Sequence, residues 1–396
     1  MRRPLVCSFD FHTSIGGSQR IIVTVLRALS SHYSIAILDP YENSAFRTLL
    51  GELAPCVDSI GSRHRRPWIS TRRGIGRACD FVAAAPLYAY TALLLRRYVK
   101  SRHIDVMYVN QTKSALIAGL AVPRGVPIIY HCHSPLITGT RFLARFSRRL
   151  AKIIANSQFT ASELVRIGVP EDLIEVITNP VPLEEIRAQS ERALPDCAGT
   201  DSQRPVVLVA HALIEPLKGT ELAVRAFAEI QGMVDAELWI AGDATAANAK
   251  YVERVKALTE ELGIASHVRF LGMRQDIYAV MRHATVVVVP SLVRESFGLV
   301  AAEAMALGKA VVVSNRGALP DIVEDGHTGV VFDPDHPGEL TRALARLILE
   351  PEMRARYGKA ASLAIEERYS LEPYEARIRE LFDAVMRNRA RRADTL

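Results

Sequence analysis

The chain has 396 residues, of which 49% are hydrophobic and 23% charged. This composition excludes an intrinsically disordered protein, and the length allows two domains that each have their own core. No apolar run reaches the roughly 18 residues of a membrane-spanning helix, and no secretory signal follows Arg3. The five cysteines lack Cys-x-x-Cys spacing, which predicts reduced thiols in a cytoplasmic protein and no cysteine-bound metal.

The positive charge of the chain lies in its N-terminal half. Residues 1–185 carry 23 Lys and Arg against 13 Asp and Glu, whereas the remainder carries 26 against 30. Basic side chains concentrate at 63–77 and 141–152, and the first cluster precedes the apolar stretch 81–95. This pattern fits contact with an anionic membrane surface, with a solvated basic surface as the alternative. No nucleic-acid-binding motif accompanies the charge, so we expect no nucleic acid partner.

Strands and helices are predicted to alternate along the first half of the chain. The first apolar run ends near residue 11 and leads through a glycine loop into an amphipathic helix, and Gly16, Gly17 and Ser18 form that loop. Glycine lets the backbone approach a ligand closely, although the loop lacks the G-x-G-x-x-G dinucleotide fingerprint. Residues 81–102 predict one long helix. Such alternation is typical of a parallel sheet covered by helices.

Two histidines close the predicted strand at 126–135. His131 and His133 share one face of the strand, because residues two apart point the same way. A hydrogen-bonded structural role is the alternative for either histidine. Further strands are predicted at 152–157 and 173–182, and the polar stretch 188–204 reads as an interdomain linker.

The second half opens with a strand, a loop and a helix. Lys218 and Gly219 stand just before that helix and are suited to binding phosphate. Later, a strand that ends at Pro290 is followed by a polar loop, a helix that ends at Gly308, and a second buried strand at 309–314. This is a βαβ unit, and ligands bind at the loop edge of such sheets.

Two carboxylates occur in this unit with seven residues between them. Glu295 lies in the loop and Glu303 lies in an otherwise apolar helix, where a buried carboxylate is costly unless it is hydrogen-bonded. A ribose diol would supply two such bonds. The backbone N–H groups of Phe297, Gly298 and Leu299, after Ser296, form a predicted anion site for a diphosphate. The alternative is a pair of surface glutamates.

The stretch 295–329 resembles the donor-sugar signature of the retaining nucleotide-sugar glycosyltransferases of group 1 / family 4. The family pattern is Glu, seven residues, Glu, a small apolar strand, a glycine-rich turn, an acidic residue and D-G-x-x-G. The chain has Asp321 where the family usually has Glu. It matches at Glu295, Phe297, Gly298, Glu303, Ala304, Gly308, Gly317, Pro320, Asp325, Gly326 and Gly329.

The resemblance implies an α/β fold with two Rossmann-like domains facing across a cleft, the GT-B fold, with parallel sheets flanked by helices. Residues 1–187 would form the acceptor-binding domain, 188–204 the linker and 205–370 the donor-binding domain. The C-terminal helix, 371–396, would pack back on the first domain.

The resemblance also implies roles for single residues. The catalytic set would be Glu295 on the donor-sugar hydroxyls, Lys218 on the diphosphate and His133 near the sugar. The family usually has an arginine five residues before this lysine; here Leu213 occupies the position and His211 is the nearest polar substitute. The remaining implied positions are Glu303 on the ribose, Gly272 and Met273 at the nucleobase, and Gly16, Gly17 and Ser18 facing the sugar and acceptor.

The leading hypothesis is a retaining hexosyltransferase that moves a sugar from a UDP- or GDP-sugar to a glycan or lipid-linked acceptor. Such an enzyme would serve cell-surface polysaccharide or glycolipid synthesis in the cytoplasm, with peripheral contact to the cytoplasmic face of the membrane. No D-x-D pair ends a strand, so we expect no metal and no other cofactor. The alternatives are a nucleotide-sugar epimerase on the same fold and a catalytically silent nucleotide-sugar-binding protein.

Overall fold

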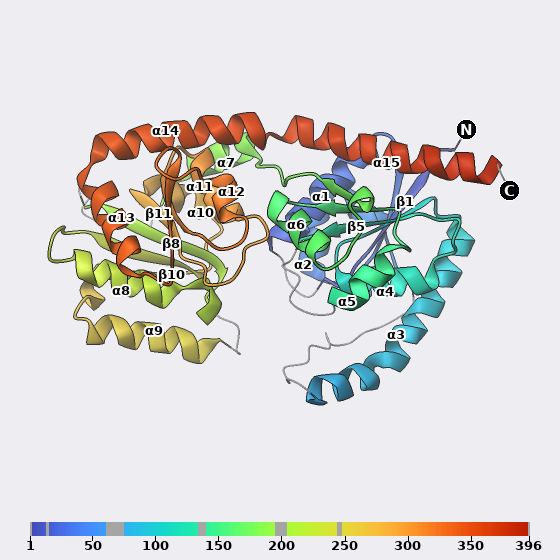
Figure 1. Ribbon diagram of the computed structural model, residues 1–396, viewed down its shortest axis with the longest axis horizontal. Coiled ribbons are helices and arrows are strands. Elements are labelled where there is room, and N and C mark those ends of the chain that lie inside the picture. Colours follow the sequence, from blue (N-terminus) through green and yellow to red (C-terminus); the bar gives the residue numbers. More distant parts are fainter. Residues whose placement is uncertain are drawn as a thin grey trace. The chain divides into compact units, whose positions relative to one another are not determined.

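The chain forms two compact units in the computed structural model, which describes residues 2–12, 16–60, 75–133, 140–194, 204–243 and 248–394 (Figure 1). The first unit contains residues 1–178 and 372–396, and the second contains residues 179–371. Each unit is a parallel sheet with helices on both faces. Among the described residues, no helix is long and apolar enough to cross a membrane.

The first unit contains a seven-stranded parallel sheet in the order β3-β2-β1-β4-β5-β6-β7. Its inner strands are rich in Val, Ile and Tyr and are buried on both faces, as expected for a parallel sheet between two helical layers. The strands are β1 Leu5–Phe9, β2 Ser34–Leu38, β3 Val57–Asp58, β4 Val106–Val109, β5 Ile128–Cys132, β6 Lys152–Ala155 and β7 Ile174–Val176.

Two helical layers cover this sheet. One core lies against α3 to α6, and the other lies against α1, α2 and the C-terminal helix α15. The helices are α1 Gly17–Ser30, α2 Ser44–Leu50, α3 Ile75–Arg102, α4 Thr112–Ala121, α5 Thr140–Ser147, α6 Gln158–Arg166 and α15 Leu371–Asp394, with 3-10 turns at η1 Gly51–Cys56 and η2 Glu171–Leu173.

The C-terminal helix α15 is tied to the first unit by its side chains. The Tyr33 hydroxyl donates to Asp383, and Phe382 packs edge-to-face on Tyr108 with ring centroids 5.8 Å apart. Arg389 Nη1 donates to Asp105 Oδ1 at 2.7 Å. The last helix therefore completes the first core although it follows the second unit in sequence.

The second unit contains a six-stranded parallel sheet in the order β10-β9-β8-β11-β12-β13. Its four central strands are mostly apolar, and their Val, Ala, Leu, Ile and Trp side chains are nearly inaccessible to solvent, although one strand ends at the exposed Asp243. The strands are β8 Val206–Leu213, β9 Glu237–Asp243, β10 Val268–Gly272, β11 Val286–Val289, β12 Ala310–Ser314 and β13 Gly329–Phe332.

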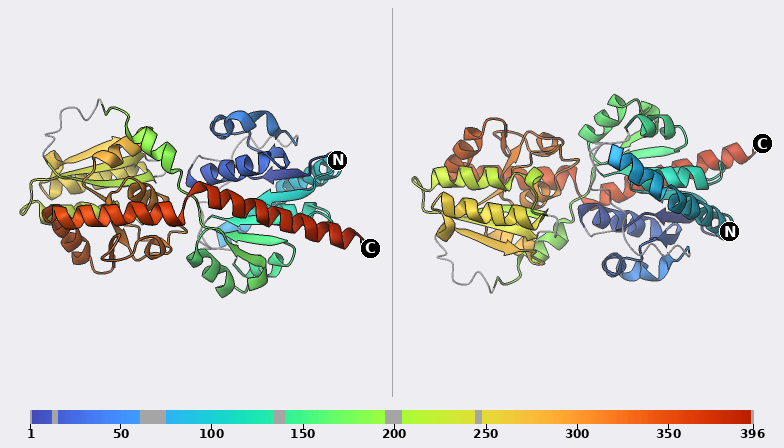
Figure 2. Two further views of the ribbon diagram at one scale, coloured as in Figure 1. Left: turned by 90° about the horizontal axis from the view of Figure 1, so that it is seen from above. Right: turned by 90° about the horizontal axis from the view of Figure 1, so that it is seen from below.

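Figure 2 shows α14 on one side of the second unit and α8 and α9 on the other, and the two cores follow this division. The helices of this unit are α7 Leu183–Ser190, α8 Thr220–Ile230, α9 Ala249–Glu261, α10 Ile277–His283, α11 Leu299–Ala306, α12 Leu319–Ile322, α13 Gly338–Leu349 and α14 Pro351–Arg368, with 3-10 turns at η4 Pro216–Lys218 and η5 Ala265–His267.

Helix α7 lies in the second unit, whereas the sequence predicted that the first domain runs to residue 187. Its Ile186 is fully buried in the core of the second unit, beside Val181, and the division between the units falls after Thr178. The polar composition of 188–204 suggested a later boundary, but the apolar side of α7 decides where this helix packs. Part of the expected linker, residues 195–203, lies outside the described residues.

Candidate functional site

The strand order of the second unit creates a topological switch between β8 and β11. The chain passes from β8 outward to β9 and β10, and then returns to place β11 on the other side of β8. Loops that follow two such strands diverge, which opens a crevice at the carboxyl edge of the sheet. The loop after β8 carries Lys218, and the loop after β11 carries Glu295.

These two side chains form an ion pair. Lys218 Nζ donates to Glu295 Oε1 at 2.7 Å, and the lysine and glutamate side chains are 27% and 20% exposed. The hydroxyl of buried Ser291 donates to the same carboxylate oxygen. Partial burial restricts solvent screening of the pair, so the charges are held in place but remain open to a ligand.

Close backbone approaches set the geometry of both loops. Gly219 has a φ of +74°, and a Cβ there would come within 1.9 Å of the Pro290 carbonyl oxygen, so only glycine fits between the two loops. Gly317 has a φ of +70°, and a Cβ there would lie 2.1 Å from the Glu295 carbonyl oxygen. Gly219 and Gly317 therefore allow the close backbone contacts that position the Lys218 and Glu295 loops.

The helix α11 begins directly after this loop. Its N-cap is Gly298, with a φ of +107° and no side-chain cap, so the first N–H groups of the helix have no side chain or intrahelical carbonyl to accept them. One turn further on, Glu303 Oε1 accepts a hydrogen bond from the buried Tyr278 hydroxyl at 2.9 Å. The structure thus places an oriented carboxylate about one turn after an uncapped helix start.

The other expected donor positions lie at the neighbouring strand ends. Gly272 ends β10 and is exposed, as is Met273, which is 56% accessible. Beside them, Arg274 makes a two-pronged ion pair with Asp276, with N–O distances of 2.7 and 2.6 Å. Sequence reasoning did not single out this pair, which stiffens the turn after β10.

The chain has a leucine at the position where the family pattern places a diphosphate-binding arginine. Leu213 is the last residue of β8, and His211 lies two residues before it in the same strand. Burial, with a smaller contribution from Lys218, lowers the pKa of His211 to about 3, and its Nε2 has no hydrogen-bond partner among the described residues. His211 is therefore neutral near pH 7 and does not replace the positive charge of the missing arginine.

A second set of polar side chains lies at the carboxyl edge of the first sheet. Asp10, Asn110 and His133 are the residues that directly follow the adjacent strands β1, β4 and β5. Asp10 is fully buried and accepts from the Asn110 backbone N–H at 2.9 Å, the Asn110 Nδ2 at 2.8 Å and the Gln111 N–H at 3.1 Å. His133 Nε2 lies 3.0 Å from Asn110 Oδ1.

The two candidate histidines of β5 occupy different environments. His131 is fully buried, and its Nδ1 lies 2.8 Å from the Tyr108 hydroxyl. Its ring centroid lies 3.9 Å from that of His133, with the two planes tilted by 37°, and His133 is at the strand end and only partly covered. Burial lowers the pKa of His133 to about 3, and burial together with His133 lowers the pKa of His131. Both rings are therefore neutral near pH 7.

The expected glycine loop of the first unit is the start of helix α1. Gly16 is the N-cap and Gly17 the first helical residue, and Gln19 Oε1 accepts from the Gly16 N–H at 2.9 Å and from the Ser18 hydroxyl at 3.1 Å. Gly16 has an extended φ of −152°, and a Cβ there would meet only Gln19 Oε1, at 3.6 Å. The described chain therefore gives no steric reason for glycine at position 16.

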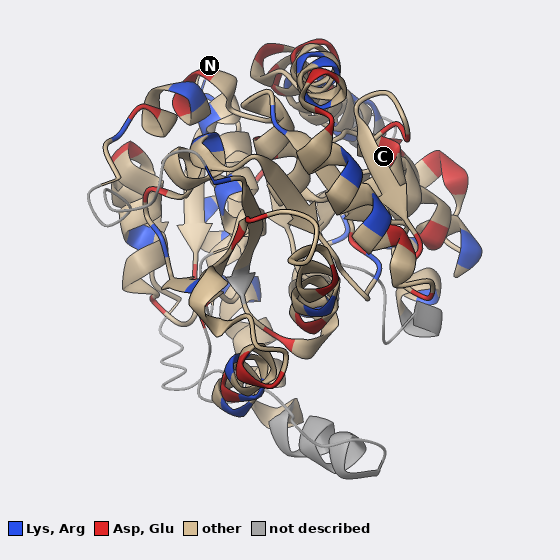
Figure 3. Ribbon diagram, turned by 90° about the vertical axis from the view of Figure 1, so that its left-hand side faces the viewer, with Lys and Arg blue, Asp and Glu red and all other residues tan. Residues whose placement is uncertain are grey.

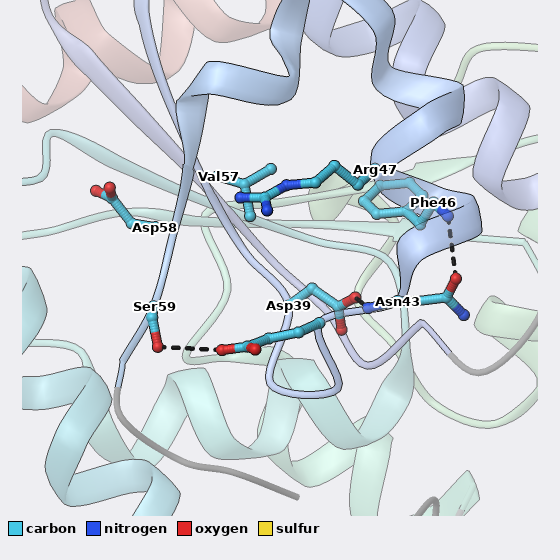
Figure 4. Close-up of a pocket in the computed structure, with 8 residues that line it drawn as sticks. Asp39, Asn43, Phe46, Arg47, Val57, Asp58 and Ser59 are labelled. Atoms are coloured by element: carbon cyan, nitrogen blue, oxygen red, sulfur yellow. Dashed lines mark hydrogen bonds between the residues drawn. The ribbon is translucent and has the colours of Figure 1, made fainter. Parts of the chain in front are cut away.

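The first unit also contains a pocket of about 170 Å³ beside the ends of β2 and β3. Figure 4 shows the carboxylates of Asp39 and Asp58 and the guanidinium of Arg47 among its lining side chains. Glu42 lines it as well, has an unusual φ of +50°, and accepts from the Ser59 hydroxyl at 3.3 Å. The lining suits a small molecule rich in hydroxyl groups, because both acceptors and a cation face it.

Figure 3 shows acidic and basic positions interspersed along the helices that face the viewer, without a stretch of one sign. Most of the basic cluster at 63–77 lies outside the described residues. No group of three or more potential metal ligands occurs among the residues that the structure describes.

Similarity to known proteins covers both units. Residues 15–185 match the model of Glycosyltransferase Family 4, and residues 193–363 match that of Glycosyl transferases group 1. The D-inositol 3-phosphate glycosyltransferase of Saccharomonospora viridis is 30% identical over 304 residues, which are 69% of each chain. That of Corynebacterium jeikeium is 38% identical over 153 residues, which are 37% of this chain and 36% of that protein.

Solved structures share the fold at lower identity. Anabaena HepE in complex with UDP and glucose superposes with a TM-score of 0.78 at 22% identity, covering 96% of this chain and 100% of that one. Sucrose-phosphate synthase from Thermosynechococcus elongatus gives a TM-score of 0.75 at 20% identity, covering 98% and 100%. Together with the two parallel sheets, these matches confirm the predicted fold. The chain belongs to the group 1 / family 4 glycosyltransferases, which are retaining enzymes with the GT-B fold.

Proposed function

We propose that this glycosyltransferase moves a hexose from a UDP-sugar to a hydroxyl group of a glycan or lipid-linked acceptor, and that its second unit holds the donor. The observation that carries the proposal is the 2.7 Å pair between Lys218 and Glu295 at the topological switch. An ammonium group has three N–H donors. One of them meets Glu295, and the others are suited to the oxygens of a diphosphate beside the start of α11.

The chemical step needs charge stabilisation on the leaving group. As the bond between the sugar and the diphosphate breaks, negative charge grows on the diphosphate oxygens. Lys218 and the uncapped N–H groups at Gly298 would stabilise that charge in the transition state more than in the ground state. Glu295 would hold the sugar ring through its hydroxyls, fixed in orientation by the Ser291 hydroxyl.

Glu303 is proposed to accept hydrogen bonds from the ribose hydroxyls. The Tyr278 hydroxyl holds the carboxylate on the helix α11, next to the proposed diphosphate site. The base would lie at the end of β10, where Gly272 and Met273 are accessible. The relative from Anabaena was solved with UDP, which supports uridine rather than guanosine as the donor base.

The first unit is proposed to bind the acceptor. The absence of a steric need for glycine at position 16 supports close approach of a ligand to the Gly16, Gly17 and Ser18 backbone, and the pocket beside Arg47 offers room for a hydroxylated ring. The names of the curated relatives favour a second candidate acceptor, D-inositol 3-phosphate. We further infer a cytoplasmic enzyme that contacts an anionic membrane surface through the basic first half, in cell-surface polysaccharide or glycolipid synthesis.

A donor panel tests the proposal. Purified protein would be incubated with UDP- and GDP-hexoses, with and without a membrane lipid extract or D-inositol 3-phosphate, while released nucleotide and labelled product are measured. We expect UDP release that an acceptor accelerates, a product with the anomeric configuration of the donor, and full activity in EDTA. Release with no product in any acceptor arm, or loss of activity in EDTA that Mg²⁺ restores, would contradict the proposal.

A further inference from the structure

We infer that Asp10 and Asn110 are positioning residues that fix His133 in the tautomer with its proton on Nε2. The inference deepens the proposed function, in which His133 faces the donor sugar. It concerns three residues that are far apart in sequence and adjacent only in the fold, because each directly follows one of the neighbouring strands β1, β4 and β5.

The first step concerns Asp10. Its partners are two backbone N–H groups, at Asn110 and Gln111, and the side-chain Nδ2 of Asn110. All of them are donors, and Asp10 acts only as an acceptor when it is ionised, that is, above its pKa of about 7. Asp10 and Asn110 are 0% and 6% exposed, which keeps water from competing for these bonds.

The second step fixes the amide of Asn110. Because the Nδ2 end donates to Asp10 at 2.8 Å, the Oδ1 end must point the other way, and it lies 3.0 Å from His133 Nε2. Rotating the amide by half a turn would place a carbonyl oxygen against the Asp10 carboxylate. Two acceptors cannot form a hydrogen bond with each other, so that orientation is unfavourable. The carboxylate therefore assigns the amide orientation.

The third step concerns the imidazole. A carbonyl oxygen can only accept, so His133 must donate from Nε2. In a neutral ring with Nε2 protonated, Nδ1 carries the lone pair and is the acceptor atom. Nδ1, which is covered in this structure, is then the atom that would accept a hydrogen bond from a hydroxyl of the sugar or of the acceptor, whereas the opposite tautomer would present a donor. The hydrogen-bonded series Asp10–Asn110–His133 thus determines whether His133 offers a substrate hydroxyl an acceptor or a donor.

Nitrogen NMR of protein labelled at its histidines measures the tautomer directly. The His133 signals would be assigned by their loss in His133→Gln. In the wild type, measured above the pKa of Asp10 so that this group is ionised, we expect a pyrrole-type Nε2 and a pyridine-type Nδ1. Asn110→Ala should leave a mixture of His133 tautomers. Asp10→Asn should leave a mixture or favour the opposite tautomer, because the Asn110 amide can then rotate.

Asn156→Ala is the matched control, since Asn156 also directly follows a strand, β6, and is 1% exposed. It should leave the His133 tautomer and the turnover number unchanged. A pyridine-type Nε2 in the wild type overturns the inference even if the Asp10 and Asn110 variants do not fold, as does an unchanged tautomer in folded Asn110→Ala. In kinetics, Asn110→Ala should lower kcat by at least tenfold with the donor KM nearly constant. If the tautomer is as expected but His133→Gln is fully active, the role of His133 in the proposed function fails while the positioning chain stands.

Discussion

The two units place their polar residues at the same edge of a parallel sheet but use opposite chemistry there. In the second unit a charged pair, Lys218 and Glu295, is partly exposed and open to a ligand. In the first unit Asp10 is fully buried, and it acts on a neutral His133 through Asn110. In the proposed function, this is the difference between a site that would bind a charged diphosphate and a site that would orient uncharged hydroxyls.

The largest expected effect lies on the charged side. Lys218→Ala should lower kcat at saturating donor by about 100- to 1,000-fold, the usual consequence of removing one group that stabilises charge in the transition state. Lys256→Ala, which removes a solvent-exposed partner of Glu253, is the control and should change nothing. If Lys218→Ala raises the donor Kd but keeps full turnover, the lysine binds the donor without assisting its departure.

Removing the second carboxylate should affect binding more than chemistry. Hydrogen bonds to a charged group contribute about 1.5–3 kcal/mol, so Glu303→Ala should weaken UDP-sugar binding by about 10- to 150-fold in calorimetry. The melting temperature should fall little, since Glu303 is only partly buried. Glu253→Ala on the exposed face of α9 is the matched control. A variant that melts far below the wild type yet binds the donor normally would make Glu303 a structural residue.

Acid should lower the stability of the first unit. Burial lowers the pKa of His12 and His133 to about 3 and also lowers that of His131 in this unit. In the second unit burial lowers the pKa of His211 to about 3 and also lowers that of His283. The unfolded chain takes up protons below pH about 6.5 that these folded rings refuse, so stability is complete above that pH and is lost as pH falls.

Burial raises the pKa of Asp10 to about 7, and this group has the opposite effect: it favours folding below that pH, where its folded form keeps a proton. In the first unit three histidines act against Asp10 and against Asp39, whose pKa burial also raises. Hydrogen exchange at about pH 7.5 and about pH 5 should show how much protection the first unit loses as pH falls, and His12→Gln should reduce that loss. A loss that His12→Gln leaves unchanged would show that this buried histidine does not govern acid stability.

The smallest effect concerns the membrane. Each basic residue near an anionic surface contributes about 1 kcal/mol, and salt screens it. The protein should sediment partly with anionic vesicles, not with neutral ones, and should be released as ionic strength rises. Replacing Arg65 and Arg66 by Gln should reduce sedimentation, whereas the same change at Arg342 and Arg356, exposed in the second unit, should not. Equal binding to both vesicle types would favour a soluble acceptor.

The same contrast explains what the sequence predicts and what it does not. Glu295 and Glu303 lie in one short stretch, and Lys218 precedes a helix, so local spacing and the family pattern were enough to find them. Tyr278 is 25 residues from its partner Glu303, and Asp10 is 100 residues from Asn110; such partners become visible only when the strand order is known. Asn110 lies directly after a strand, but sequence spacing alone did not reveal its role there.

One measurement tests the division of labour most directly: the donor Kd and the kcat for transfer, determined side by side for Glu303→Gln and Asn110→Ala. The account predicts that Glu303→Gln raises the Kd of the UDP-sugar by about tenfold or more, whereas Asn110→Ala keeps the wild-type Kd and loses turnover. The reverse pattern, with donor affinity lost in Asn110→Ala and kept in Glu303→Gln, would contradict the assignment of the donor to the second unit.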